Sequence, residues 1–122
     1  AAIFNLGFSD KVVTEAEARE GRAAASTISP GAPALVFWAE IFGLEKNDTV
    51  TMSITGPGGE TLVEHAETMV KAKARWFQYV GKKLKGEAWP AGKYVGTIEV
   101  ARGKTATKET ASASIPDLSA SE

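Results

Sequence analysis

The sequence contains no cysteine and a single histidine, His65. Without cysteine, disulfides, thiol nucleophiles and cysteine-ligated zinc sites are excluded, although the absence suits several compartments and does not identify one. Zinc sites usually need several histidines or cysteines, and a Ser–His–acid triad would have to use His65. Glu64 and Glu67 flank His65 and suggest at most a weak metal site. We therefore expect no metal site, no cofactor and no catalytic residue.

Long apolar runs are also missing. The longest, residues 34–39, has the length of a strand and falls far short of the roughly 20 residues of a membrane-spanning helix. We therefore expect no membrane span. No basic segment followed by an apolar one marks a signal peptide at the start. The chain begins at Ala1 without methionine, and its start in strand-like sequence leads us to expect a domain excised from a longer polypeptide, with a processed protein as the alternative.

Acids and bases nearly balance, and the formal net charge is −1. The charges are unevenly distributed, because residues 68–86 hold six bases and no acid, while all 15 acids lie elsewhere. A basic segment attracts anionic ligands, whereas modules that bind nucleic acid usually have a net basic surface. We therefore expect no nucleic acid among the partners of this chain.

Alternating apolar and polar residues predict about seven β-strands. Residues 33–44 are apolar on both faces, as in a central strand, whereas residues 49–55 place Val, Met and Ile on one face and Thr and Ser on the other. The expected strands are residues 2–8, 33–44, 49–55, 60–66, 74–80, 94–100 and 105–115. Short strands with a turn roughly every 8–12 residues predict an all-β fold. We expect a single domain over residues 1–122 that forms an immunoglobulin-like antiparallel β-sandwich.

Three segments lack strand character. Residues 11–32 combine charges with small residues and favour a loop or a linker-like insertion, with one helical turn at 15–20 as an alternative. Residues 67–73 also fit one helical turn. Residues 117–122 follow Pro116 as a polar tail.

The stretch 75–100 gathers aromatic residues and lysines around a Trp-Pro-Ala-Gly turn. Tyr94 follows this turn, where the tyrosine corner of immunoglobulin-like sandwiches places a tyrosine whose hydroxyl bonds to the backbone upstream. We expect structural roles for five residues of the strands and of this turn: Trp38, Trp76, Tyr94, Pro90 and Gly92.

Lysines beside aromatic residues also suggest a binding surface. Aromatic rings stack on nucleotide bases or sugar rings, and lysines attract anions. Sandwich aromatics more often fill the core, however, and lysines more often lie on a solvated loop. The exposed connection at residues 81–87 is therefore the stretch best suited to contact a partner. The candidate binding residues are Lys82, Lys83, Lys85, Tyr79 and Trp89.

Several turn and strand motifs occur in an order that resembles a known family. They are IFNLGF (3–8), GAPALV (31–36), GLEKND (43–48), ITGPGG (54–59), YVGKK (79–83), WPAGKY (89–94) and Arg102-Gly103. Their order resembles the C-terminal immunoglobulin-like region attached to lysostaphin-type zinc metallopeptidases of Gram-negative bacteria. That resemblance implies a periplasmic or secreted protein associated with enzymes that cleave peptidoglycan cross-bridges. The zinc site of those enzymes uses several histidines and an aspartate, which this chain lacks, so no catalytic or metal residue carries over.

Three hypotheses about the function follow. The first is a non-catalytic accessory or binding module of the bacterial envelope, whose partner is a peptidase domain, cell-wall material or another envelope protein. The second is a structural or protein-interaction domain that forms a weak homodimer through an edge strand at residues 106–115. A small hydrolase is least favoured, because no Gly-x-Ser-x-Gly motif occurs and no acid stands in a distinctive catalytic context.

Overall fold

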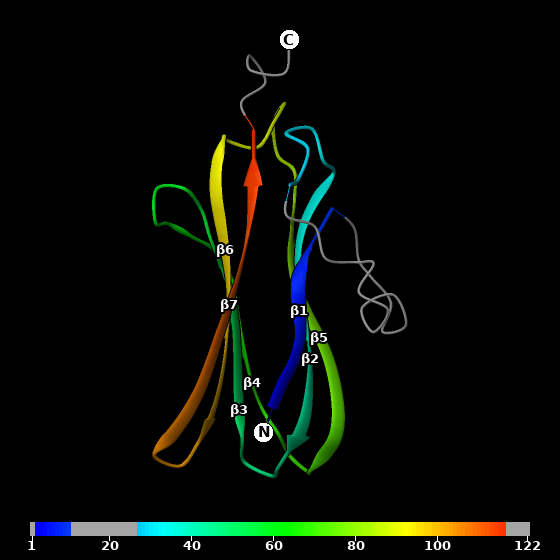
Figure 1. Cartoon of the computed structure of the whole chain (residues 1–122), viewed down its shortest axis with the longest axis vertical. Coiled ribbons are helices and arrows are strands. Elements are labelled where there is room, and N and C mark those ends of the chain that lie inside the picture. Colours follow the sequence, from blue (N-terminus) through cyan, green and yellow to red (C-terminus); the bar gives the residue numbers. More distant parts are fainter. Residues whose placement is uncertain (1, 11–26, 117–122) are drawn as a thin grey trace.

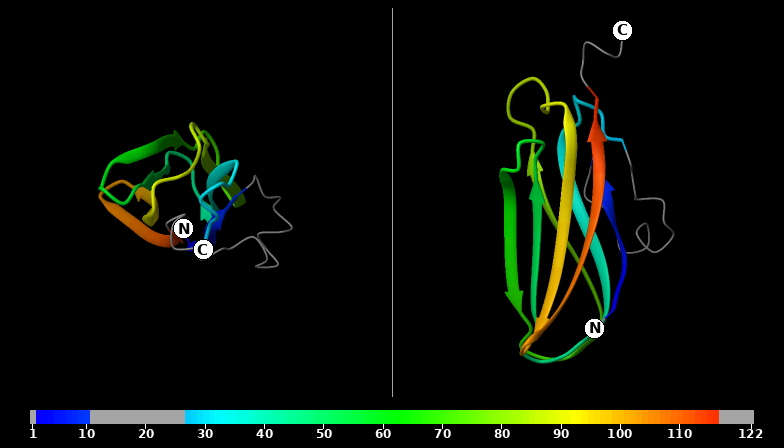
Figure 2. Two further views of the ribbon diagram at one scale, coloured as in Figure 1. Left: turned by 90° about the horizontal axis from the view of Figure 1, so that it is seen from above. Right: turned by 60° about the vertical axis from the view of Figure 1, so that its left-hand side comes forward.

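The chain forms two antiparallel sheets that pack face to face. A computed structural model describes residues 2–10 and 27–116, and within them it contains seven strands and no helix. The strands are β1 (Ala2–Ser9), β2 (Ala34–Leu44), β3 (Thr49–Thr55), β4 (Thr61–Thr68), β5 (Lys73–Lys83), β6 (Gly92–Arg102) and β7 (Thr105–Ile115). One sheet has the order β1-β2-β5 and the other β4-β3-β6-β7 (Figures 1 and 2). The predicted all-β, immunoglobulin-like sandwich is confirmed.

The fourth strand distinguishes this sandwich from constant-type immunoglobulin domains. In those domains the fourth strand joins the sheet of the first two strands, whereas here β4 pairs with β3 along Thr49–Thr55. The chain then crosses to β5, which pairs with β2, and crosses back to β6, which pairs with β3. As a result β4 and β5 are edge strands of different sheets, and so are β1 and β7.

The core lies between the sheets and follows the predicted alternation. In β3, Val50, Met52 and Ile54 are buried. The inward residues of β2 and β6 are equally buried: Leu35, Phe37, Ala39, Ile41, Tyr94, Ile98 and Val100. Gly96 of β6 also faces inward, and a Cβ there would overlap the ring of Phe37. The Phe37 ring therefore occupies the space that any other residue at position 96 would need.

Two of the predicted strand limits were wrong at β5. The strand extends from Lys73 to Lys83, so residues 81–83 continue the strand and do not belong to the connection. Pairing explains the difference, since Lys83 is still opposite Ala34 at the start of β2. Strand partners thus override the weak β propensity of Gly and Lys. The alternative helical turn at 67–73 is also absent, because β4 reaches Thr68 and β5 begins at Lys73.

The end of the predicted loop at 11–32 contributes to the core. Ile28 and Ala32 are 3% and 4% exposed. The Ile28 amide donates to the Ser114 carbonyl (2.9 Å), which attaches this segment to β7. Residues 27–32 are therefore part of the sandwich and not a linker. Residues 11–26 and the expected tail at 117–122 lie outside the described residues.

A tyrosine corner is present at the start of β6. The Tyr94 hydroxyl donates to the Pro90 carbonyl at 2.6 Å, four residues upstream. Gly92 has φ +139°, and a Cβ there would lie 2.5 Å from Pro57, so only glycine fits the turn without strain. The tyrosine hydroxyl and the glycine together set the path by which the connection enters β6.

The two tryptophans outside this corner lie on opposite faces of the three-stranded sheet. Trp38 is 1% exposed, but it points away from the inter-sheet core and packs against Phe77, with ring centroids 6.3 Å apart. Trp76 is half-buried and packs against the core from its edge. The outer face of this sheet is therefore partly apolar as well.

An ion pair between the buried Asp48 and the half-exposed Arg102 closes the end of the sandwich opposite the tyrosine corner. Asp48, whose side chain is 1% exposed, accepts hydrogen bonds from Arg102 Nε (2.8 Å) and Nη2 (2.7 Å). The Glu45 amide donates a further bond to Asp48 Oδ2 (2.8 Å). The hydrogen bonds from Arg102 are the main reason that the pKa of Asp48 falls to about 2, although burial acts in the opposite direction.

Candidate functional site

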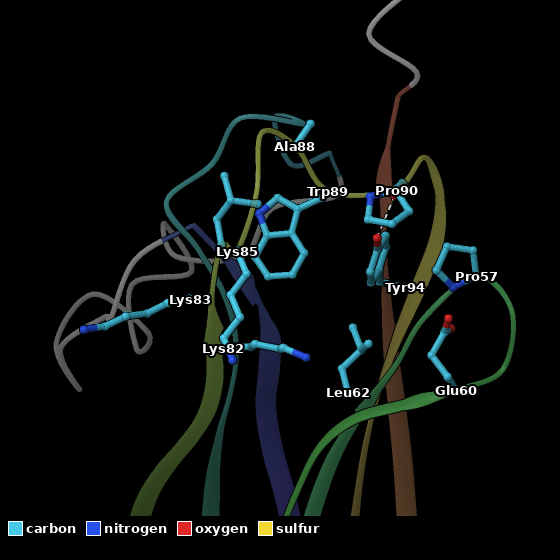
Figure 3. Close-up of a pocket in the computed structure, with 11 residues that line it drawn as sticks. Pro57, Glu60, Leu62, Lys82, Lys83, Lys85, Ala88, Trp89, Pro90 and Tyr94 are labelled. Atoms are coloured by element: carbon cyan, nitrogen blue, oxygen red, sulfur yellow. Dashed lines mark hydrogen bonds between the residues drawn. The ribbon is translucent and has the colours of Figure 1, made fainter.

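A pocket of about 230 Å³ opens at the end of the sandwich opposite this ion pair, the upper end in Figure 1. It lies between the β3–β4 turn and the connection from β5 to β6. We call it the basic pocket (Figure 3). Its lining residues are Pro57, Glu60, Leu62, Lys82, Lys83, Leu84, Lys85, Ala88, Trp89, Pro90 and Tyr94. Both sheets contribute to it, since β5 belongs to one sheet and β4 and β6 to the other.

The apolar part of the pocket is built from aromatic and leucine side chains. Trp89 and Tyr94 meet edge to face, with ring centroids 6.4 Å apart and an interplanar angle of 85°. Edge-to-face pairs of this kind are a favoured aromatic arrangement. Leu62 and Leu84 are half-buried beside them. An apolar surface held between two packed sheets is available to a ligand without rearrangement.

The connection that carries Trp89 is held firmly in place. The Trp89 indole N–H donates to the Ala32 carbonyl (2.9 Å), and the Trp89 amide donates to the Pro30 carbonyl (2.8 Å). The Leu84 amide donates to the Pro33 carbonyl (2.9 Å). Three hydrogen bonds thus tie residues 84–89 to the loop before β2, which makes the wall of the pocket pre-formed.

The lysines of β5 separate according to the alternation of the strand. Lys82 is opposite the inward residue Leu35, whereas Lys83 is opposite Ala34, so their side chains project from opposite faces. In Figure 3 the Lys82 side chain reaches toward Leu62, and the Lys83 side chain points away from the pocket. Lys85 lies on the same side as Lys82, next to Trp89. Two lysines, not three, therefore present their side chains to this pocket.

The opposite wall carries a carboxylate. Glu60 follows the β3–β4 turn and lies below Pro57 in Figure 3. The Gly58 amide donates to Glu60 Oε1 (3.1 Å), and the Gly56 amide donates to the Glu60 carbonyl (2.8 Å). Burial raises the pKa of Tyr94, and the negative charge of Glu60 raises it further. Glu60 is thus oriented by its own turn, and its negative charge influences Tyr94 in the pocket.

Tyr79 lies on a different surface. It is 41% exposed on the outer face of β5, where its ring follows Phe77 at a centroid distance of 6.5 Å. Together with Val36, Gly81 and Lys83 it borders a second groove of about 220 Å³. The five predicted binding residues are therefore divided: Lys82, Lys85 and Trp89 meet in the basic pocket, while the side chains of Lys83 and Tyr79 belong to the outer face.

Sequence reasoning missed the contribution of the β3–β4 hairpin. Glu60 and Leu62 carry no local signal, since an acid after a Gly-Pro-Gly-Gly turn and a leucine in a strand are both ordinary. Only the pairing of β4 with β3 brings them beside the β5–β6 connection. Tertiary proximity of this kind is not encoded in a short window of sequence.

The single histidine forms no larger polar cluster. His65 is exposed on β4, with Nε2 3.4 Å from Glu67 Oε1. Among residues 2–10 and 27–116, no three His, Cys, Asp or Glu side chains lie close enough together to hold a metal ion. The same residues form no helix long and apolar enough to cross a membrane.

Comparison with known proteins does not identify a relative. The chain matches no protein-family model, no curated protein and no solved structure. The chemistry of the basic pocket and the motifs of the sequence are therefore the grounds for a proposed function.

Proposed function

We propose that this chain is a non-catalytic binding module of the bacterial cell envelope that holds anionic cell-wall material for a peptidoglycan-cleaving metallopeptidase. The observation that carries the proposal is the placement of Lys82 and Lys85 at a pre-formed aromatic pocket. A positive charge beside an apolar wall attracts an anion more strongly than one surrounded by water, because the local dielectric constant is lower. The pocket thus combines attraction with a surface that the ligand can cover.

The size of the pocket favours binding of part of a larger molecule. Its volume of about 230 Å³ is smaller than the roughly 300–1,000 Å³ of pockets that enclose a whole drug-sized ligand. A polymer that offers a short anionic segment suits such a site. The peptides and phosphates of cell walls are anionic, and the resemblance to peptidase-associated modules supports an envelope location. A peptidase domain, cell-wall material or another envelope protein would then be the partner.

Binding to purified cell-wall sacculi tests this proposal. The variant Lys82→Glu/Lys85→Glu reverses both pocket charges, and the control Lys83→Glu/Lys104→Glu makes the same change in net charge outside the pocket. Because exposed ion pairs contribute about 0.2–1 kcal/mol each, exchanging attraction for repulsion at two positions should weaken binding about tenfold. The control should bind nearly as well as the wild type. Equal binding by wild type and the pocket variant contradicts the proposal.

Self-association through β7 is a second candidate. This strand forms an edge of the four-stranded sheet, and its residues 105–110 are exposed. On the edge of β7 that faces away from β6, the only strand pairing among the described residues is the single bridge between Thr27 and Ser114. Unpaired edges can add a strand from another chain. Sedimentation measured over rising protein concentration decides the matter, since a monomer at every concentration rules out pairing of this kind.

A further inference from the structure

The basic pocket carries both signs of charge on facing walls. Lys82 and Lys85 lie on one side and Glu60 on the other, with Leu62 and Tyr94 between them (Figure 3). Within the described part of the chain, none of these three charged groups takes part in an ion pair, so no lysine nitrogen comes within 4.0 Å of the Glu60 carboxylate. The pocket therefore holds opposite charges apart across an apolar gap.

The carboxylate of Glu60 is oriented by its turn. Its Oε1 atom accepts a hydrogen bond from the Gly58 amide, and it occupies the place where a Cβ on Gly56 would stand. A carboxylate that is already oriented loses less conformational entropy when it binds a cation than a freely rotating one. Glu60 is thus suited to receive a positive group at a defined point of the wall.

We infer that the basic pocket binds a small zwitterion of dipeptide size, with its carboxylate facing Lys82 and Lys85 and its ammonium facing Glu60. A purely anionic ligand would satisfy the lysines but be repelled by Glu60, whereas a zwitterion complements both walls. The apolar gap is lined by Leu62, Tyr94 and Trp89, so the middle of the ligand should be small and apolar. A volume of about 230 Å³ limits the ligand to a few small groups.

This inference rests on the proposed function, because peptides of the cell wall carry free carboxylates and amino groups. It is nevertheless narrower than that proposal. If the pocket bound the cell wall through phosphate alone, Lys82→Glu/Lys85→Glu would still weaken binding to sacculi. Ligand binding would then not depend on Glu60. The two ideas can therefore fail separately.

Titration with alanyl-alanine, followed by shifts in the ¹H–¹⁵N spectrum, tests the inference. Three kinds of probe are compared: the free dipeptide (in its L and its D form), its N-acetyl derivative and its C-terminal amide. We expect a Kd on the order of 1 mM for the free dipeptide, and at least fivefold weaker binding for each blocked probe. Shifts should centre on the Trp89 indole N–H. The inference is overturned if neither the L form nor the D form of the free dipeptide binds, or if all probes bind equally well.

Two variants assign the two ends of the ligand. In Glu60→Gln, N-acetylation should no longer weaken binding, and the glutamine oxygen can still accept the Gly58 hydrogen bond. In Lys82→Met/Lys85→Met, amidation should no longer matter, while Lys83→Met should behave as wild type. If the pocket variant loses sacculus binding but all dipeptide probes bind the wild type equally, the proposed function stands and the zwitterion inference is wrong. If the dipeptide binds as described but sacculi do not bind, the zwitterion inference stands and the proposed cell-wall ligand is wrong.

Discussion

Replacement of Asp48 by asparagine should show how much the ion pair between Asp48 and Arg102 contributes to stability. The substitution keeps the shape of the side chain but removes the charge from a group that is 1% exposed. It leaves Arg102 without the two short hydrogen bonds to a carboxylate, at 2.8 Å and 2.7 Å. The backbone bond from Glu45 to Asp48 can still form with the amide oxygen. The change therefore removes the charge and one of the two oxygens that accept hydrogen bonds from Arg102.

The magnitude follows from the pKa of Asp48, which is lowered from 3.8 to about 2 in the folded chain. One pKa unit corresponds to about 1.4 kcal/mol, so ionisation of this carboxyl stabilises the fold by about 2 kcal/mol at neutral pH. Because the folded pKa lies below the unfolded one, the contribution is complete above about pH 4. It is lost as the pH falls through about 2, when the carboxyl becomes protonated in both states.

Urea unfolding followed by tryptophan fluorescence measures the effect. The free energy of unfolding of Asp48→Asn should lie about 2 kcal/mol below that of the wild type at pH 7, and the difference should shrink toward zero near pH 2. Glu109→Gln, on the exposed part of β7, is the matched control and should change little at either pH. A difference that is the same at both pH values refutes the reasoning, because it would arise from packing and not from ionisation.

Two further substitutions test the packing of the core. Gly96→Ala should lower the free energy of unfolding by about 1–3 kcal/mol, since its Cβ would overlap the Phe37 ring; Gly31→Ala, which has open space around it, is its control in the same urea titration. Tyr94→Phe removes the hydroxyl that donates to the Pro90 carbonyl and should lower the free energy of unfolding by about 1 kcal/mol. An unchanged thermal midpoint in Tyr94→Phe would show that the tyrosine corner contributes nothing.

The strands were predictable where side chains alternate cleanly between turns. Thr49–Thr55 and Thr105–Ile115 have the bounds expected from the sequence, since Thr or Ser alternates with apolar residues over most of each strand and turn residues bracket them. The end of β5 was not predictable, because it depends on pairing with β2 and not on its own residues. That error had a consequence for the candidate site. With residues 81–83 taken as a loop, Lys82 and Lys83 looked equivalent, whereas the strand directs them to opposite faces.

The tyrosine corner was predictable because its elements are close in the sequence. Tyr94, Gly92 and Pro90 form a short motif whose geometry depends on local bonds. The facing wall of the pocket was not, because Glu60 approaches Tyr94 only through the pairing of β3 with β4 and β6. Charges that oppose each other across a pocket are a property of the folded topology.

Because the walls of the basic pocket come from different sheets, the pocket exists only when the sandwich is assembled. Lys82 lies on the three-stranded sheet, and Leu62 and Tyr94 lie on the four-stranded one. Any ligand of the pocket must therefore bind the folded chain and not the unfolded one, so it raises the free energy of unfolding by about 2.7 kcal/mol at a concentration of 100 Kd. Thermal denaturation can thus serve as a label-free screen for ligands, in which a compound that binds at the pocket delays the separation of the two sheets.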